Sequence, residues 1–227
     1  CIILTAINAS AYDFEVDGIY YNIISNVDLT VEVTNKYKDS VGGNSSYSGS
    51  VVVPDMVRYE NKNYSVVRIG DDAFGSYYGD GCDITEVVLP ETIEEIRPDA
   101  FRNCYKLLKI NMPENLNIIG SYAFCRTELA TLVIPDCCTA IGSSAFEGCG
   151  NLRMVVLGKG LKIIENEAFG SCSKLLEVFF LASKEPGCGY RIFSGNENLR
   201  LYVPSRKTYS FGQEMVSFES SSFEYTG

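Results

Sequence analysis

Along most of the chain, a short alternating run of apolar and polar positions is followed by a small residue and a phenylalanine, and the pattern recurs at a nearly constant distance. Alanine precedes the phenylalanine in five of the six copies, and isoleucine precedes it in the last. The steps between copies are 27, 23, 22, 23 and 24 residues, from Phe74 through Phe101, Phe124, Phe146 and Phe169 to Phe193. Such a period indicates an internal structural repeat, which governs the fold of the whole chain.

Each repeat predicts two β-strands. The first is an alternating apolar run that ends in proline or a substitute for it, as in VVLP at 87–90. From Pro90, Pro113, Pro135 and Gly158 to the next phenylalanine is 11 residues every time. A second apolar position lies between the two, and isoleucine occupies it at Ile69, Ile96, Ile119, Ile141 and Ile164. The constant spacing predicts that every repeat forms one turn of the same geometry.

A repeat of about 23 residues with apolar positions spaced as L-x-x-V-x-L is typical of leucine-rich-repeat solenoids. One unit buries too little apolar surface to offset the conformational entropy lost in ordering it, so neighbouring units have to stack. We therefore predict a right-handed β/α superhelix that is rich in β-structure and has little helix. Glycine follows the second isoleucine in three repeats, but Arg97 and Glu165 occupy the same position, which predicts ordinary backbone dihedrals there.

The repeats occupy residues 50–203 as about six units, and the flanking sequences predict caps. Residues 12–49 alternate around Asp17-Gly18 and then become polar, as expected for a β-rich N-terminal cap followed by a link. Residues 204–227 form a polar tail with interspersed aromatic residues, which predicts a C-terminal cap.

Two irregularities lie near the start of the repeats. The first unit contains the extra stretch RYENKNYSV at 58–66, which alternates on both sides of four polar residues and predicts a β-hairpin. After Phe74, the stretch GSYYGDGCD at 75–83 is longer than its counterparts and predicts a protruding loop.

The chain opens with a short apolar run, CIILTAI, followed by Ala9-Ser10-Ala11, a small-x-small pattern of the kind that signal peptidase cleaves. We interpret residues 1–11 as the tail of a secretory signal, with an ordinary first strand and a lipidated Cys1 as the alternatives. No stretch of the sequence reaches the roughly 18 uninterrupted apolar residues that a spanning helix needs. We expect a secreted or surface-tethered protein without a transmembrane segment.

Several complete units resemble the BspA-type leucine-rich repeats, also called the Treponema type. The resemblance covers about residues 50–203 and is carried by the recurring motif I-G-x-x-A-F, as in LATLVIPDCCTAIGSSAFEGCGN at 129–151. It implies a bacterial secreted or cell-surface interaction protein that binds host extracellular matrix, host cells or other microbes. It does not imply an active site, and members differ widely in their ligands.

Alternation along the first strand of each unit predicts which side chains point out of the sheet. One outward column comprises Ser50, Glu86, Lys109, Thr131, Met154, Glu177 and Arg200, and a second comprises Val52, Val88, Asn111, Val133, Val156, Phe179 and Tyr202. The second column is mostly apolar, and contiguous exposed apolar surface often marks a binding site, although strand propensity alone also favours valine. The predicted partner-binding candidates are Met154, Val156, Phe179, Tyr202, Glu177 and Arg200.

Composition excludes several classes of function. Acidic residues outnumber basic ones 29 to 19, and the formal charge of −10 makes nucleic acid an improbable partner. The chain has no histidine, and it has no G-x-S-x-G, Walker or G-x-G-x-x-G motif, so we expect no enzyme and no cofactor. A protein or glycan partner is the first hypothesis. The alternatives are a carbohydrate-active or envelope-remodelling enzyme with paired carboxylates, and a spacer domain of a surface complex.

Nine cysteines raise the question of disulfides and metals. Cys104, Cys149 and Cys172 each lie three residues after a repeat phenylalanine, so they share one inward position, where buried free thiols are favoured over disulfides. Zinc has little support because the sequence has no C-x-x-C and no histidine. Four acids flank the long loop and could hold calcium, but their spacing matches no EF-hand, which favours solvated loop residues; they are Asp71, Asp72, Asp80 and Asp83.

Overall fold

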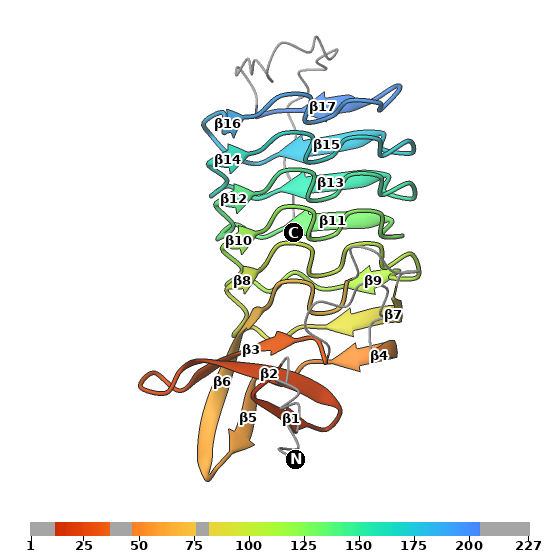
Figure 1. Ribbon diagram of the computed structural model, residues 1–227. Helices are drawn as coiled ribbons and strands as arrows, with labels where there is room; N and C mark the ends of the chain where they lie inside the picture. The colour runs from red at the N-terminus through yellow and green to blue at the C-terminus, as the bar shows by residue number, and fades with distance from the viewer. Residues whose placement is uncertain (1–11, 37–46, 76–81, 205–227) are drawn as a thin grey trace, which may run out of the picture.

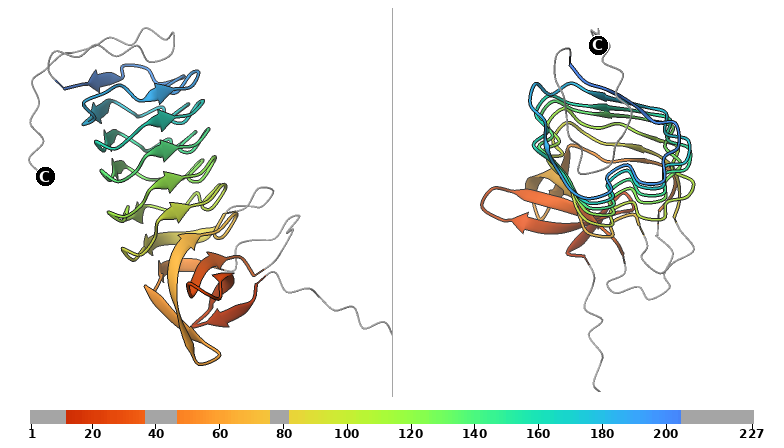
Figure 2. Two further views of the ribbon diagram at one scale, coloured as in Figure 1. Left: turned by 90° about the vertical axis from the view of Figure 1, so that its left-hand side faces the viewer. Right: turned by 90° about the horizontal axis from the view of Figure 1, so that it is seen from above.

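The structure is a computed structural model, and it describes residues 12–36, 47–75 and 82–204. These residues form a stack of similar flat turns that rises from a β-rich base at the N-terminal end (Figure 1). Figure 2 shows the turns edge-on and from above, where their outlines nearly superimpose. The described residues contain no helix, so the predicted β-rich leucine-rich-repeat solenoid of about six turns is confirmed.

Three sheets run along the stack (Figure 1). The largest comprises, in spatial order, β1 (Phe14–Val16), β2 (Ile19–Ser25), β3 (Thr30–Thr34), β6 (Lys62–Ile69), β8 (Glu95–Ile96), β10 (Ile118–Ile119), β12 (Ala140–Ile141), β14 (Ile163–Ile164) and β16 (Gly187–Cys188), with β5 (Met56–Tyr59) paired to β6. The second comprises β11 (Thr131–Ile134), β13 (Met154–Leu157), β15 (Glu177–Phe180) and β17 (Arg200–Tyr202). The third comprises β4 (Ser48–Val52), β7 (Asp83–Val88) and β9 (Lys109–Ile110).

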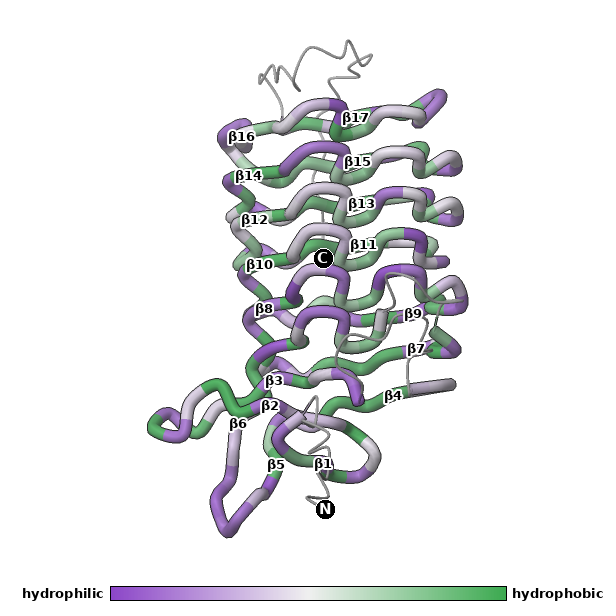
Figure 3. The backbone as a smooth tube through the Cα atoms, in the orientation of Figure 1, coloured by the Kyte–Doolittle hydropathy of each residue, from purple (hydrophilic) through white to green (hydrophobic). Residues whose placement is uncertain are grey.

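The repeats pair in parallel and in one register. Ile96, Ile119, Ile141 and Ile164 are direct neighbours on successive strands, and all four are fully buried. The constant 11-residue spacing therefore produces turns of the same geometry, as predicted, because each unit places its second isoleucine directly above that of the previous unit. Apolar and polar segments alternate around every turn (Figure 3), and the core includes residues outside the strands, such as the repeat phenylalanines.

The repeat phenylalanines form a continuous stack through the core. Ring centroids from Phe74 to Phe193 are 5.0 to 5.7 Å apart, and the rings are close to parallel. The preceding alanine is completely buried in the five units that have it, and Ile192, which takes this position in the last unit, is also buried. Offset ring stacking contributes about 0.5–1.5 kcal/mol per pair beyond the burial of area.

The tight turn before each phenylalanine has a left-handed residue that the sequence did not reveal. The residue two positions before the phenylalanine has a φ between 51° and 58° in all six units, and none of the six is glycine: Asp72, Asp99, Tyr122, Ser144, Glu167 and Arg191. The turn is held by backbone bonds to the next unit, as in the Tyr122 N–H that donates to the Ser143 carbonyl at 2.9 Å. Repeated tertiary bonding of this kind outweighs the local preference against positive φ.

The glycines after the second isoleucine have ordinary dihedrals, as predicted, because Gly70, Gly120 and Gly142 do not have positive φ. Gly120 and Gly142 nevertheless lie very close to the backbone of the preceding turn. A Cβ on Gly142 would lie 2.5 Å from the backbone nitrogen of Ser121, and a Cβ on Gly120 would lie 2.5 Å from the nitrogen of Pro98. These glycines let adjacent turns approach closely.

The base of the stack contains the two hairpins that the sequence predicts. Strand β1 pairs antiparallel with β2 around Asp17-Gly18, and β5 pairs antiparallel with β6 around Glu60-Asn61. Strand β3 pairs in parallel with β6, which in turn pairs with β8, so the base and the repeats share one sheet. Tyr47 closes the base, since its hydroxyl accepts from the Tyr20 N–H at 3.0 Å and donates to the Thr34 carbonyl at 2.8 Å.

Some predictions lie outside the described residues: the signal tail at 1–11, most of the link at 37–46, the protruding loop at 76–81 and the C-terminal tail at 205–227. The exact domain boundaries therefore stay predictions. In the described part of the chain, no helix is long and apolar enough to cross a membrane.

The prediction of free buried thiols is wrong for one cysteine. Cys104 forms a disulfide with Cys82, with the two Cα atoms 4.7 Å apart. Cys82 does not share the position of Cys104 in the repeat, because it belongs to the lengthened segment after Phe74, and this segment brings it beside Cys104. Cys149 and Cys172 are free and fully buried, as predicted.

The free thiols have a structural partner. Cys149 Sγ lies 3.2 Å from the carbonyl of Phe124, and Cys172 Sγ lies 3.1 Å from the carbonyl of Phe146. In the last unit Asn196 takes the same position and donates from Nδ2 to the carbonyl of Phe169 at 2.8 Å. This column therefore supplies a side-chain donor to the phenylalanine carbonyls, and at Phe124 and Phe146 it adds to a backbone N–H that donates to the same oxygen.

Candidate functional site

The first strands of the turns make up one face of the stack, which we call the strand face: β4, β7, β9, β11, β13, β15 and β17 (Figures 1 and 2). The pairing register reproduces both predicted outward columns. Thr131, Met154, Glu177 and Arg200 are successive neighbours, as are Val133, Val156, Phe179 and Tyr202. Ser50, Glu86 and Lys109 continue the first column, and Val52 and Val88 continue the second.

Two of the predicted anchors form a stacked aromatic pair near the end of the stack. The rings of Phe179 and Tyr202 have centroids 4.5 Å apart and are inclined by 10°. The Tyr202 hydroxyl donates to Glu177 Oε1 at 3.2 Å, which ties the two outward columns together. Phe179, Tyr202 and Glu177 are all half-buried, so the pair is fixed in orientation while part of each side chain remains accessible.

The other predicted candidates differ in exposure. Met154 is half-buried and Arg200 is exposed on the same column as Glu177. Val156 is only 2% exposed, so the prediction that it offers an apolar contact to solvent is wrong. Its neighbour in register is Phe179, and a small side chain beside a large ring on the adjacent strand loses its contact with water.

Several exposed apolar side chains of the strand face were not among the predicted binding candidates. Val52, Val88 and Val133 of the second column are 63%, 43% and 48% exposed. Leu108 and Leu176, which precede the first column on their strands, are 57% and 49% exposed. The sequence does contain a signal for the exposure of Leu108 and Leu176. Leucine is doubled at 107–108 and at 175–176, and only the first leucine of each pair is buried in the core.

The strand face is interrupted in its middle. In the described residues β9 pairs with β7 and β11 pairs with β13, whereas β9 and β11 belong to different sheets. The Asn111 side chain ends the pairing of β9, because it accepts from the Leu89 N–H and donates to the Leu89 carbonyl, both at 2.8 Å. The side-chain amide thus replaces a backbone group in the ladder.

The next turn is also shorter. Five residues separate Phe124 from Leu129, where six separate Phe101 from Leu107, so β11 follows a shorter loop than its neighbours. The missing residue before β11 is therefore the sequence feature on the β11 side of the interruption, whereas the Asn111 amide bonds to Leu89 on the opposite, β7 side of β9.

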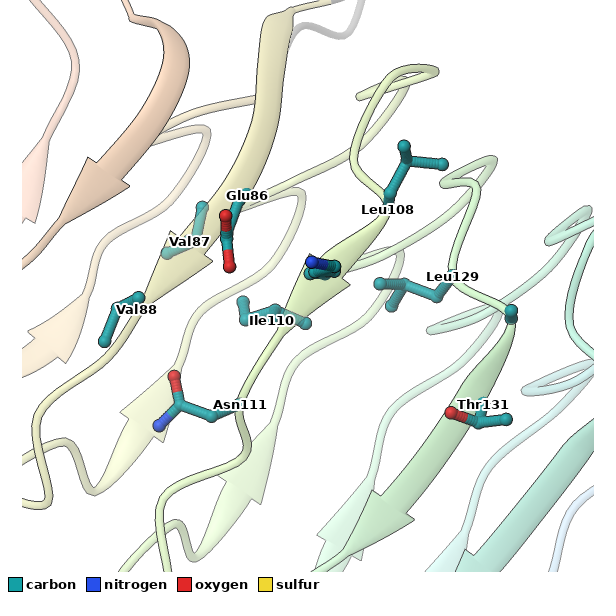
Figure 4. A pocket seen from close by; sticks show the side chains of 10 residues that line it. Glu86, Val87, Val88, Leu108, Ile110, Asn111, Leu129 and Thr131 are labelled. Atoms are coloured by element: carbon teal, nitrogen blue, oxygen red, sulfur yellow. The ribbon is translucent and has the colours of Figure 1, made fainter.

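A groove of about 380 Å³ lies at this interruption, lined by Glu86, Val87, Val88, Leu108, Lys109, Ile110, Asn111, Leu129, Ala130 and Thr131. Figure 4 shows Leu108 and Leu129 on one side, Val88 and Asn111 on the other, and the Glu86 carboxylate above the space between β7 and β9. The groove is wide here because Ala130 and Thr131 are small where the neighbouring turns carry Leu108 and Lys109. We call it the strand-face groove.

The groove combines apolar walls with one charge of each sign. Glu86 and Lys109 are direct neighbours in register, and the apolar side chains surround them. Such a surface offers apolar contact area together with polar groups that fix orientation, as binding sites commonly do. In the described residues no group of three or more acidic, cysteine or histidine side chains is placed to hold a metal ion.

The comparisons with known proteins agree with this architecture. The family model for the BspA type leucine rich repeat region matches residues 67–200 in six copies. The chain belongs to the BspA-type leucine-rich repeat family. The predicted family is therefore confirmed, and it is a family of repeat proteins found on bacterial surfaces. The comparison with curated proteins found no match.

Solved structures show the same fold. A leucine-rich repeat protein from Bacteroides ovatus is 27% identical, with a TM-score of 0.58, and the match covers 86% of this chain and 56% of that one. The pneumococcal vaccine antigen PcpA is 19% identical, with a TM-score of 0.68, covering 84% of this chain and 49% of that one. The Treponema pallidum leucine-rich repeat protein TpLRR is 21% identical, with a TM-score of 0.57, covering 88% and 98%. This chain thus spans about half the length of the first two proteins.

Proposed function

We propose that the protein is a non-enzymatic, adhesin-like interaction protein of the bacterial surface, and that its strand face binds a protein or glycan partner. The observation that supports this proposal is the set of exposed apolar side chains on the strand face, among them Val52, Val88, Leu108 and Val133, together with the strand-face groove. Exposed apolar surface of this kind is uncommon on monomeric proteins without a binding role.

The placement of the residues favours an extended contact over a small ligand. The exposed Val52, Val88 and Val133 lie along the stack, and the Phe179–Tyr202 pair lies farther along the same column. A partner that follows the stack would bury the valines, fill the groove and end on the aromatic pair. The excess of 29 acidic over 19 basic residues favours a basic surface on that partner.

Several facts support a location outside the cytoplasm. The family to which the chain belongs is one of bacterial surface proteins, and PcpA is named as a vaccine antigen. The Cys82–Cys104 disulfide is of a kind that persists in oxidising compartments. Attachment to the surface by a lipid or another tether, and a partner in the host extracellular matrix or on another microbe, are part of this proposal.

The test is a binding screen of the full chain against immobilised extracellular-matrix proteins, mucins and glycans. A saturable hit is then measured with two pairs of substitutions. The first is Leu108→Glu, in the wall of the groove, with Val133→Glu, on β11 outside the groove. The second is Phe179→Glu with Tyr202→Glu at the aromatic pair. We expect each pair to weaken binding at least about tenfold, because a carboxylate would have to be buried without a partner.

Ile163→Glu is the matched control, because Ile163 is 42% exposed on β14, outside the strand face. Binding that survives both pairs of substitutions but is lost with Ile163→Glu would contradict the proposal. Thermal unfolding of each variant separates loss of binding from loss of fold. Turnover of a polysaccharide by the same sample would support the enzyme alternative, and self-association would support the spacer alternative.

A further inference from the structure

A second groove lies on the turns that precede the repeat phenylalanines, and it shares no residue with the strand-face groove. It has a volume of about 340 Å³ and is lined by Tyr122, Ser143, Ser144, Asn166, Glu167 and Tyr190. We call it the turn groove. Its residues come from four successive turns, so it runs along the stack for about 14 Å at the usual strand spacing.

The groove exists because of one small side chain. Ser144 occupies the left-handed position of its turn, where the adjacent turns carry Tyr122 and Glu167. Its hydroxymethyl group leaves a depression between these two larger side chains. The neighbouring position of the same turns holds Ser143 and Asn166, which are also short and polar.

A tyrosine lies at each end of the turn groove. The ring of Tyr122 is held by the Arg102 guanidinium, which lies 4.5 Å from its centroid. This cation–π contact orients the ring in advance. At the other end, Tyr190 is 73% exposed, which is unusual for so large an apolar ring on a soluble protein and leaves the ring free to stack on a ligand.

The floor of the groove carries hydrogen-bonding groups with spare capacity. Ser144 is only 3% exposed, and its hydroxyl makes no hydrogen bond with any described residue. Asn166 accepts from the Tyr190 N–H through Oδ1 at 2.8 Å, and this fixes its amide while Nδ2 has no acceptor among the described residues. Ser144 is buried and Asn166 is exposed, so together they offer a hydroxyl on the floor and an accessible amide donor above it, which suits a ligand with both donors and acceptors.

The charges in the groove favour a neutral ligand. Glu167 is the one acid that lines it, and its Oε1 is paired with Arg191 at 3.3 Å. Ser143 donates to Glu165 at 2.9 Å, so that carboxylate is also engaged. An anionic ligand would meet these acids and the overall charge of −10, and a cationic one would have to compete with Arg191.

We infer that the turn groove binds a neutral saccharide of about two pyranose units. A pyranose ring has an apolar face of C–H groups, which packs on tyrosine rings, and a rim of hydroxyls, which both donate and accept hydrogen bonds. The groove offers these contacts in matching order, with a ring at each end and hydroxyl, amide and carboxylate groups between. This site is separate from the proposed partner-binding strand face.

The test is a titration of the isotope-labelled full chain with four neutral disaccharides, namely lactose, cellobiose, maltose and N,N′-diacetylchitobiose, monitored by amide chemical shifts. We expect at least one to bind saturably at millimolar concentrations, with the largest shifts at Ser144, Asn166 and Glu167. Tyr190→Ala should weaken that binding about tenfold, and Asn166→Asp should weaken it further by replacing the donor with a charge.

Tyr105→Ala is the matched control, because Tyr105 is an exposed tyrosine that does not line the groove. It should leave the affinity unchanged. The inference is overturned if none of the four sugars causes saturable shifts. It is also overturned if Tyr190→Ala leaves the affinity unchanged, or if the shifted amides lie on the strand face. The strand-face variants Leu108→Glu with Val133→Glu should bind the sugar normally, so failure of this site and failure of the proposed function are distinguishable.

Discussion

At the scale of single residues, the most informative positions are those that every turn repeats with a different side chain. The left-handed position before the phenylalanine holds Asp72, Asp99, Tyr122, Ser144, Glu167 and Arg191. The backbone there is fixed by bonds to the next turn, so the side chain is free to vary and to carry function. In the first turns this variation instead brings like charges together, since Asp71, Asp72 and Asp99 lie close to one another.

The aspartates at the first turns should make stability depend on pH. Partial loss of water, then repulsion from Asp99 and Asp71, raise the pKa of Asp72 to about 6, while Arg102 acts in the opposite direction. A carboxyl with a raised pKa in the folded state destabilises the fold once it ionises, so stability should fall as the pH rises from about 4 to about 6. Asp72→Asn should remove that fall and raise the free energy of unfolding at pH 7 by about 1 kcal/mol, as measured by urea denaturation.

Asp136 provides the comparison of opposite sign. Its pKa is lowered by hydrogen bonds from the backbone N–H and the ammonium group of Lys159. That stabilisation is present when the carboxylate is ionised and is lost as the pH falls, so Asp136→Asn should decrease stability at pH 7. If Asp72→Asn also decreases it, the repulsion at the first turns is not what controls their stability.

At the scale of elements, the turns differ in how closely they approach one another. Strands β8, β10, β12 and β14 are only two residues long, yet each pairs in register with the next. Glycine follows β10 and β12, and its lack of a side chain allows the turns to meet backbone to backbone. The spacing of the sheet therefore depends on a few residues just outside the strands.

Gly142→Ala tests this dependence. The added Cβ would lie 2.5 Å from the Ser121 nitrogen and 2.7 Å from the Gly120 carbonyl carbon, which are backbone atoms that cannot rotate away. We expect a loss of about 1–3 kcal/mol in the free energy of unfolding, measured by chemical denaturation. Gly150→Ala is the control, because no atom lies within 4 Å of its added Cβ. Equal stability of the two variants would show that the turns can move apart at no cost.

Much of this arrangement could be predicted from the sequence. The 11-residue distance from the strand end to the phenylalanine fixed the register, because a parallel stack of equal turns admits only one. The interruption between β9 and β11 was not predicted, because the one-residue shortening before Leu129 does not by itself show that two neighbouring strands fail to pair. The burial of Val156 depends on its neighbour Phe179 on the next strand, and the turn groove depends on the contrast between Ser144 and its neighbours in space.

At the scale of the whole molecule, one covalent cross-link joins two turns within the described residues. The Cys82–Cys104 disulfide joins the first complete turn to the next, directly above the base. This position follows the lengthened segment, where the repeat spacing is 27 residues and the regular register begins. The bond therefore secures the junction between the irregular base and the regular stack.

Removal of the disulfide should weaken this junction more than the rest. Cys82→Ser with Cys104→Ser opens a loop with a sequence separation of 22 residues, for which chain entropy predicts a loss of about 3 kcal/mol. Cys149→Ser with Cys172→Ser is the control, because those thiols are buried but free. Thermal unfolding of the wild type and of both double variants, with and without a reductant, gives the melting temperatures to compare. If the reductant does not change the melting temperature of the wild type, the disulfide has no stabilising role.

The identical register from β8 to β14 also bears on how such a molecule changes over generations. A duplicated unit would contact the same isoleucine, alanine and phenylalanine in the turns on either side of it. Duplication or deletion of a whole turn therefore preserves the contacts between adjacent turns. Each added turn lengthens the outer faces by about 4.8 Å and brings new side chains to them. Length and recognition surface can thus evolve while the interior stays the same.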